Sequence, residues 1–247
     1  MNNDKIIFFL HFHKSGGTTI NYLFNKYNKH KPNSNGNPWS KSNTRTGWPG
    51  TEIIKFWNYN KDEFNKFKNY LLSQKVNFVA FEWNFFKFYN EIDLTNIELI
   101  VCIRDPYKRY ISNMMVKRCH NMHNFNNRTI WWSRKRSNQK FKVNFNKYNY
   151  YTKMLNGFGD QPNIKINHTH LEIAKNNLFK FSTIIILEDK DTFQLLEKYN
   201  IYNIEHKNKN KKKKKLRLSR AEFKKYNIYD YELYNYAINL SRSRLIK

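Results

Sequence analysis

Short apolar runs alternate along this chain with segments in which apolar residues recur at helical spacing. The runs are rich in β-branched and aromatic residues and cover residues 6–10, 78–81, 99–103 and 183–187. Continuous runs of this kind are typical of strands that are covered on both faces. The alternation predicts an α/β fold with a mainly parallel β-sheet flanked by helices. No Pro/Gly/Ser-rich linker divides the 247 residues, which predicts a single domain over 1–247.

Helical spacing and capping residues mark the helices between these runs. Ser219 and Glu222 form a capping box before a short helix, and Asp105 is a favourable N-cap followed by Pro106. We expect the helix after Pro106 to turn four residues inward: Tyr107, Tyr110, Ile111 and Met114. Other apolar stripes fall at Ile20, Leu23, Phe24 and Tyr27, at Leu171, Ala174 and Leu178, at Phe193 and Leu196, and at Leu233, Ala237 and Leu240.

The first apolar run ends in a glycine-rich loop, Lys-Ser-Gly-Gly-Thr-Thr, at residues 14–19. Gly16 and Gly17 let the backbone come close to a ligand, and the start of the next helix offers amides without intrahelical acceptors. Lys14 adds a positive charge. The loop therefore predicts anion binding. It is not a Walker P-loop, because its lysine precedes the glycines instead of following them.

A second polar motif follows the run at 99–103 and reads Arg-Asp-Pro-x-x-Arg-x-x-Ser. Arg104 stands at the carboxyl end of the predicted strand, and Ser112 lies within the helix after it. Ligands of open α/β sheets bind outside the carboxyl ends of the strands, which is where both motifs fall. The two motifs therefore support each other. For Arg109, a surface charge and a buttress of the loop are equally open interpretations.

The first loop resembles the sulfonate-side loop of the PAPS-dependent sulfotransferases, particularly their carbohydrate branch, with His13 where that family usually has proline. The second motif resembles the family's second phosphate site. Residues 149–157, NYYTKMLNG, are similar to a segment of one branch. The resemblance implies a P-loop-like nucleotide-binding fold and transfer of a sulfuryl group from PAPS to a hydroxyl or amine, with a carbohydrate as the favoured acceptor. The product nucleotide would be 3′-phosphoadenosine 5′-phosphate.

The resemblance also implies roles for single residues. Lys14 would stabilise the transition state, and Arg104 with Ser112 would hold the 3′-phosphate. The 5′-phosphate would be held by the amides and hydroxyls of Ser15, Gly16, Gly17, Thr18 and Thr19.

A hydroxyl acceptor needs a general base within hydrogen-bond reach. Glu82 directly follows an apolar run, and it falls where many carbohydrate sulfotransferases carry a histidine or glutamate base. Burial beside aromatic residues would raise its pKa, which suits a base, although a pairing with one of the many lysines is the competing interpretation. His11 and His13 border the first loop and are second choices. The histidines form no HExxH pair, so no metal site is predicted.

The net charge of +26, from 45 Lys and Arg against 19 Asp and Glu, implies an anionic partner. A glycan, a nucleic acid and an anionic membrane surface all fit, and the lysines at 211–215 would bind any of them. The basic and aromatic stretch at 117–147, with Trp39 and Trp48, is the candidate region for acceptor recognition. A non-catalytic polyanion- or nucleic-acid-binding protein on the same fold therefore stays open. An unusual P-loop kinase is disfavoured, because Gly-Lys-Ser/Thr is absent.

The two cysteines, Cys102 and Cys119, do not suggest a disulfide framework or a cysteine metal site. No signal peptide or membrane anchor is recognisable, so we expect a cytoplasmic protein. The abundance of Lys, Asn, Ile, Tyr and Phe suggests an AT-rich coding sequence, as in a protist or a large DNA virus. For a viral protein, the compartment would be the host cytoplasm.

Overall fold

The computed structural model describes residues 5–27, 59–73, 78–82, 93–119, 148–158, 164–202, 204 and 218–246. Its centre is a four-stranded, fully parallel sheet with the strand order β2-β1-β3-β4. The strands are β1 (Ile6–His11), β2 (Phe78–Glu82), β3 (Ile97–Ile103) and β4 (Thr183–Ile186). The predicted α/β class and parallel sheet are thus confirmed.

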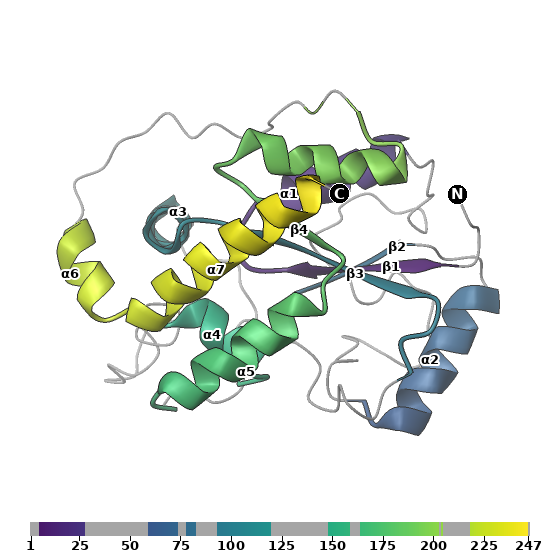
Figure 1. Cartoon of the computed structure of the whole chain (residues 1–247), viewed down its shortest axis with the longest axis horizontal. Helices are drawn as coiled ribbons and strands as arrows, with labels where there is room; N and C mark the ends of the chain where they lie inside the picture. Colours follow the sequence, from purple (N-terminus) through teal and green to yellow (C-terminus); the bar gives the residue numbers. More distant parts are fainter. Residues whose placement is uncertain are drawn as a thin grey trace.

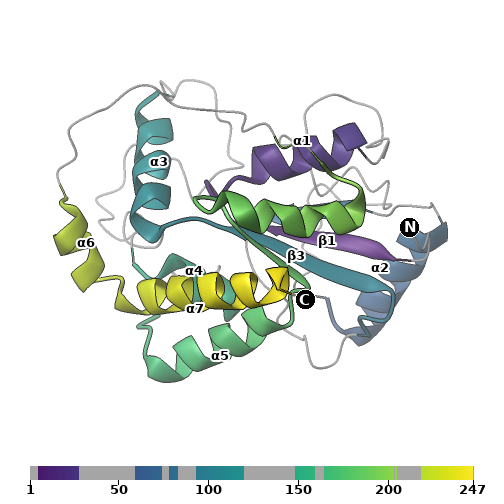
Figure 2. The ribbon, with the colours of Figure 1, turned by 45° about the horizontal axis from the view of Figure 1, so that its top comes forward.

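Helices cover both faces of this sheet (Figures 1 and 2). One face carries helix α1 (Gly17–Tyr27) and the 3₁₀ helix η5 (Lys190–Tyr199). The opposite face carries α2 (Lys61–Ser73), α4 (Tyr150–Leu155), α5 (His168–Phe179) and α7 (Ile228–Leu245). Two further helices, α3 (Pro106–Cys119) and α6 (Arg220–Lys225), lie beyond the carboxyl ends of the strands (Figure 1).

Strand β1 is buried along its whole length and separates two apolar clusters. Phe8 and Leu10 point into the cluster beneath α2, α4, α5 and α7, whereas Ile7 and Phe9 point toward α1 and η5. Full burial of one such side chain contributes about 1.5–3 kcal/mol to folding. A strand that is apolar on both faces is stable only in this central place, which explains its continuous apolar run.

Most of the predicted helical stripes face the core. Ile20, Leu23 and Phe24 of α1 are buried, as are the stripes on α5 and η5. In α7, Leu233 and Ala237 are buried and Leu240 is half-buried. The predicted capping box before α6 is present, because the Ser219 side chain accepts from the Glu222 amide and the Glu222 side chain accepts from the Ser219 amide.

Helix α3 differs from the prediction. Among the α3 side chains that the structure describes, Pro106, Arg109 and Asn113 are buried, the last two each 1% exposed, whereas Tyr107 and Tyr110 are only half-buried. The reason is that both tyrosines pack against Phe223 of α6, with ring centroids 5.5 and 4.9 Å from it. Ile111 is also half-buried, and the side chain of Met114 lies outside the described residues. The expected inward face was therefore wrong, and so was the surface-charge interpretation of Arg109.

The start of α3 agrees with the sequence. The Asp105 carboxylate accepts a hydrogen bond from the Lys108 amide at 2.8 Å, and Pro106 is the first helical residue. Cys102 is buried within β3, where burial raises the pKa of its thiol. Among the helices in the described ranges, none has the length and apolar character needed to cross a membrane.

Candidate functional site at the carboxyl ends of β1 and β3

The strand order places a topological switch point between β1 and β3. Strand β2 lies on one side of β1, and β3 with β4 lies on the other, so successive connections leave the sheet in opposite directions. Open α/β sheets bind ligands at such a point, outside the carboxyl ends of the strands. The loop at 12–16 follows β1, and residues 104–105 follow β3. Both sequence motifs therefore lie at the switch point.

Backbone geometry explains why glycine is needed in the β1 loop. Lys14 and Gly16 have φ angles of 66° and 88°, in the left-handed region that only glycine adopts without cost. A Cβ atom on Gly17 would lie 1.8 Å from Cδ2 of His11, so a side chain has no room there. The amides of Thr19 and Ile20 donate to the Gly16 carbonyl and start helix α1. The loop thus places two residues without side chains, Gly16 and Gly17, at the N-terminus of α1.

Arg104 connects the β1 loop to the end of β4. Its Nη1 atom donates to the Lys14 carbonyl oxygen at 3.4 Å, and its Nε atom lies 3.5 Å from Oε1 of Glu188. Lys108 Nζ is 3.9 Å from the same carboxylate oxygen. Arg104 is half-buried, which reduces screening of its charge by water. Two cations therefore lie close to a single carboxylate at this edge.

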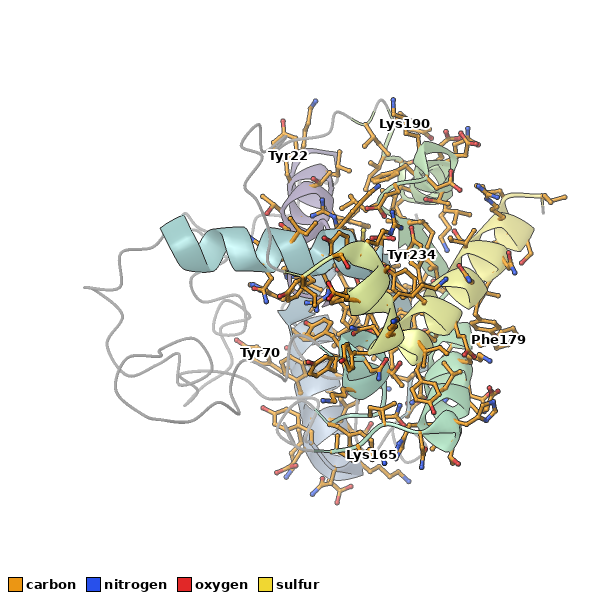
Figure 3. All side chains as sticks on the ribbon, turned by 90° about the vertical axis from the view of Figure 1, so that its left-hand side faces the viewer. Tyr22, Tyr70, Lys165, Phe179, Lys190 and Tyr234 are labelled. Carbon is orange, nitrogen blue, oxygen red and sulfur yellow. The ribbon has the colours of Figure 1, made fainter. Side chains whose placement is uncertain are left out.

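Sequence reasoning missed Glu188, which directly follows the predicted strand at 183–187. Its Oε2 atom accepts hydrogen bonds from the Asp105 amide at 2.9 Å and from the Tyr234 hydroxyl at 3.2 Å. In Figure 3, Tyr234 of α7 is labelled near the centre of the view and the exposed Phe179 of α5 at its right-hand side. Burial, followed by the negative charge of Glu188, raises the pKa of Tyr234. The rule that drew attention to Arg104, a polar residue just after a buried strand, would also have found Glu188.

The other missed residue is Tyr151 in the first turn of α4. Its hydroxyl lies 2.8 Å from Oγ of Ser15, accepts from the Arg104 amide at 3.1 Å and donates to the Arg104 carbonyl at 2.8 Å. The neighbouring Tyr150 hydroxyl accepts from the His13 amide at 3.0 Å. In the sequence, the segment at 149–157 is an indicator of fold only. Its two tyrosines in fact contact the backbone of both motifs.

Arg109 is a buttress beneath these tyrosines. The centre of its guanidinium lies 3.7 Å from the centroid of the Tyr150 ring and 5.6 Å from that of Tyr151. A buried guanidinium over an aromatic face gains cation–π attraction that partly offsets its desolvation. The positive charge also opposes the effect of burial on Tyr151, whose pKa nevertheless is raised well above the ordinary value of 10.0.

The remaining predicted site residues occupy different parts of this edge. Thr18 is exposed at the start of α1, while Thr19 is buried. Ser112 is half-buried and stands about 9 Å along α3 from its start at Pro106, given a rise of about 1.5 Å per residue. The Ser15 side chain is buried against Tyr151, so a direct contact with a phosphate would require that hydrogen bond to open.

The candidate base lies at the same edge of the sheet. Glu82 is the last residue of β2, and its backbone is paired with His11 of β1, but its side chain lies outside the described residues. His11 itself is buried, with its ring 5.8 Å from that of Phe9. Its packing under Gly17 gives it a structural part in the loop.

Several expectations concern residues that the structure does not describe. They are Trp39, Trp48, the greater part of the acceptor region, 120–147, and the lysines at 211–215. Within the described ranges, no group of three His, Cys, Asp or Glu side chains is arranged to hold a metal ion. No protein-family model matches the chain, and no curated protein matches it either.

Proposed function

We propose that this protein is a PAPS-dependent sulfotransferase with a P-loop-like nucleotide-binding fold. The observation that carries the proposal is the meeting of two anion-binding motifs at one switch point. Lys14 and Arg104 are 90 residues apart in sequence, yet the Arg104 guanidinium donates to the Lys14 carbonyl. A nucleotide that carries two anionic groups can be held by two cationic loops that lie next to each other.

The described residues fit such a nucleotide. The glycine loop offers helix N-terminal amides and the Lys14 charge to one anionic group. Arg104 offers a planar guanidinium, which pairs with phosphate oxygens in a bidentate manner, and Ser112 is a hydroxyl further along α3. A side chain at Gly17 would overlap His11, so glycine is needed there for the loop to pack closely on β1. In this proposal Ser15, Gly16, Gly17, Thr18 and Thr19 surround the 5′-phosphate, and Arg104 and Ser112 hold the 3′-phosphate.

PAPS, when bound, supplies a sulfuryl group: its sulfur bonds to the acceptor oxygen while the bond to the phosphate oxygen breaks, and 3′-phosphoadenosine 5′-phosphate leaves. Lys14 stabilises the negative charge that builds up on the oxygens, because a fixed cation requires no reorganisation during the step. Glu82 accepts the proton of the acceptor hydroxyl, and His11 and His13 are the second choices. The favoured acceptor is a carbohydrate, bound by residues of the region at 117–147.

The experiment is a calorimetric titration with 3′-phosphoadenosine 5′-phosphate at moderate salt, with ATP as the competing nucleotide. We expect the wild type to prefer the first nucleotide. Arg104→Ala should weaken binding by roughly tenfold to a hundredfold, the loss typical of a charge-assisted hydrogen bond. Lys198→Ala, which removes a paired cation on η5, is the matched control and should bind normally. Equal affinity for ATP, or no binding at all, would reject the proposal.

A second candidate function is polyanion binding without catalysis, which the net charge of +26 favours. Here single-stranded RNA or DNA would bind with an affinity that falls steeply and linearly on a log–log salt plot. The same protein would not discriminate between 3′-phosphoadenosine 5′-phosphate and ATP. The titration above, repeated at three salt concentrations, separates the two functions.

A further inference from the structure

A single hydroxyl group, that of Tyr151, contacts both motifs of the site. It lies 2.8 Å from the Ser15 hydroxyl in the β1 loop and forms two hydrogen bonds with the backbone of Arg104 after β3. Ser15 and Tyr151 are separated by 136 residues, and both are buried. The two loops are therefore connected through a residue that belongs to neither of them.

The hydrogen count fixes the direction of these bonds. A phenol has one proton, and that of Tyr151 is donated to the Arg104 carbonyl. The hydroxyl must then accept from both the Arg104 amide and the Ser15 hydroxyl. Because burial raises the pKa of Tyr151, the phenol keeps this proton at neutral pH. The Ser15 amide is also occupied, since it donates to the Phe12 carbonyl. Both donors of Ser15 thus have acceptors within the protein: the hydroxyl donates to Tyr151 and the amide to Phe12.

The position of Tyr151 is also set by hydrogen bonds between the start of α4 and residues of α7 or just before it. The buried Asp230 carboxylate accepts from the amides of Tyr151 and Thr152 at 3.0 and 2.9 Å, and from the Thr152 hydroxyl. The Asn149 amide donates to the Asn227 side chain just before α7. The first turn of α4 is therefore fixed to a core helix. The Tyr151 side chain therefore starts from a backbone whose position depends on α7 and on neither loop.

We infer that Tyr151 is a positioning residue that sets the separation between the β1 loop and Arg104. The inference deepens the proposed function and rests on it for the choice of ligand. With the loops held apart at a fixed distance, a nucleotide with two phosphates finds both subsites in place and loses less free energy in ordering them. A nucleotide with a single phosphate uses one subsite and gains little from their separation.

The test compares Tyr151→Phe with Tyr199→Phe, which removes a matched buried hydroxyl. Tyr199 bonds to Thr183 and Glu98 at the amino ends of the strands, away from the site. Affinities are measured for 3′-phosphoadenosine 5′-phosphate and for 5′-AMP, and amide hydrogen exchange is followed at residues 12–17 and at Arg104.

For Tyr151→Phe we expect binding of the two-phosphate nucleotide to weaken about tenfold, the equivalent of about 1.4 kcal/mol, and that of 5′-AMP by less than about threefold. Exchange of the Arg104 amide should accelerate together with that of the β1 loop, because the amide loses its acceptor. Tyr199→Phe should show neither change. Ser15→Ala, which keeps both bonds between Tyr151 and Arg104, should accelerate exchange in the β1 loop alone.

Two results would overturn the inference. One is a Tyr151→Phe protein whose exchange at both loops equals that of Tyr199→Phe, and the other is an equal loss of affinity for both nucleotides. If the wild type does not bind 3′-phosphoadenosine 5′-phosphate, the proposed function fails, and the exchange measurements still decide the role of Tyr151. If Tyr151→Phe does not fold, Ser15→Ala decides: unchanged exchange in the β1 loop would overturn the inference.

Discussion

The amino edge of the sheet, where the strands begin, and the carboxyl edge, where they end, contain the same kinds of residue but use them differently. At the amino edge, Glu98 of β3 accepts from Lys198 and from the Tyr199 hydroxyl, so one carboxylate is matched by one cation and one phenol. At the carboxyl edge, Glu188 lies close to two cations, Arg104 and Lys108. Two phenols lie there: Tyr234 donates to Glu188, whereas Tyr151 donates to the backbone carbonyl of Arg104.

This difference shows that charge content by itself does not mark a functional site. The chain has a net charge of +26, and at the amino edge the cation Lys198 is paired with Glu98. The carboxyl edge adds a glycine loop, a helix N-terminus and a surplus of positive charge at the switch point. Position in the sheet therefore separates a candidate site from a structural ion pair.

The largest effect is expected on the reaction rate, when one lysine is replaced by alanine at each edge in turn. Lys14→Ala should lower the rate of sulfuryl transfer by about 10²–10³-fold, the usual result of removing one preorganised transition-state partner. Lys198→Ala removes the same charge from the amino edge and should leave the rate unchanged. The rate is measured as release of 3′-phosphoadenosine 5′-phosphate with a glycan acceptor. Similar losses in both variants would mean that only overall charge matters.

A smaller effect is expected on stability from Gly17→Ala. The new Cβ would lie 1.8 Å from the His11 ring, an overlap that should lower the free energy of unfolding by about 1–3 kcal/mol. Denaturant titration of Gly17→Ala, His11→Ala and the double variant measures the coupling. We expect the double variant to lose less than the sum of the single losses. Additive losses would contradict the packing explanation for this glycine.

The smallest effect is expected on the pH dependence of stability, through Glu98 at the amino edge. Burial raises the pKa of Glu98, but hydrogen bonds from Lys198 and Tyr199 outweigh it and hold the pKa below the ordinary value of 4.5. A lowered folded-state pKa stabilises the protein above pH 4.5, and this contribution is lost as the pH falls through the folded-state pKa.

Glu98→Gln should therefore reduce the loss of stability between pH 7 and pH 3, by less than about 1 kcal/mol for a partly exposed pair. Denaturant titrations at both pH values measure it. Glu197→Gln, at an exposed position of η5, the 3₁₀ helix that carries Lys198 and Tyr199, is the control and should follow the wild type. A Glu98→Gln protein as acid-sensitive as the wild type would show that this ion pair contributes nothing to the pH dependence.

The sequence predicted what depends on near neighbours. Apolar runs identified the strands, and helical spacing identified the inner face of α1 and α5. The cap at Asp105 followed from its neighbour Pro106, and the capping box followed from Ser219 and Glu222, three positions apart. The inner face of α3 was predicted wrongly, because the tyrosines chosen for it pack on α6, which lies more than a hundred residues further along the chain.

The sequence by itself determined the strands, most helices and the two loops that carry Lys14 and Arg104. Only the tertiary structure decided the strand order, the burial of Arg109 and the contacts of Tyr151 and Glu188. The physical reason is distance along the chain. A strand, a cap or a glycine turn is fixed by atoms a few residues apart, whereas a hydrogen bond across 47 or 136 residues exists only after the sheet has assembled.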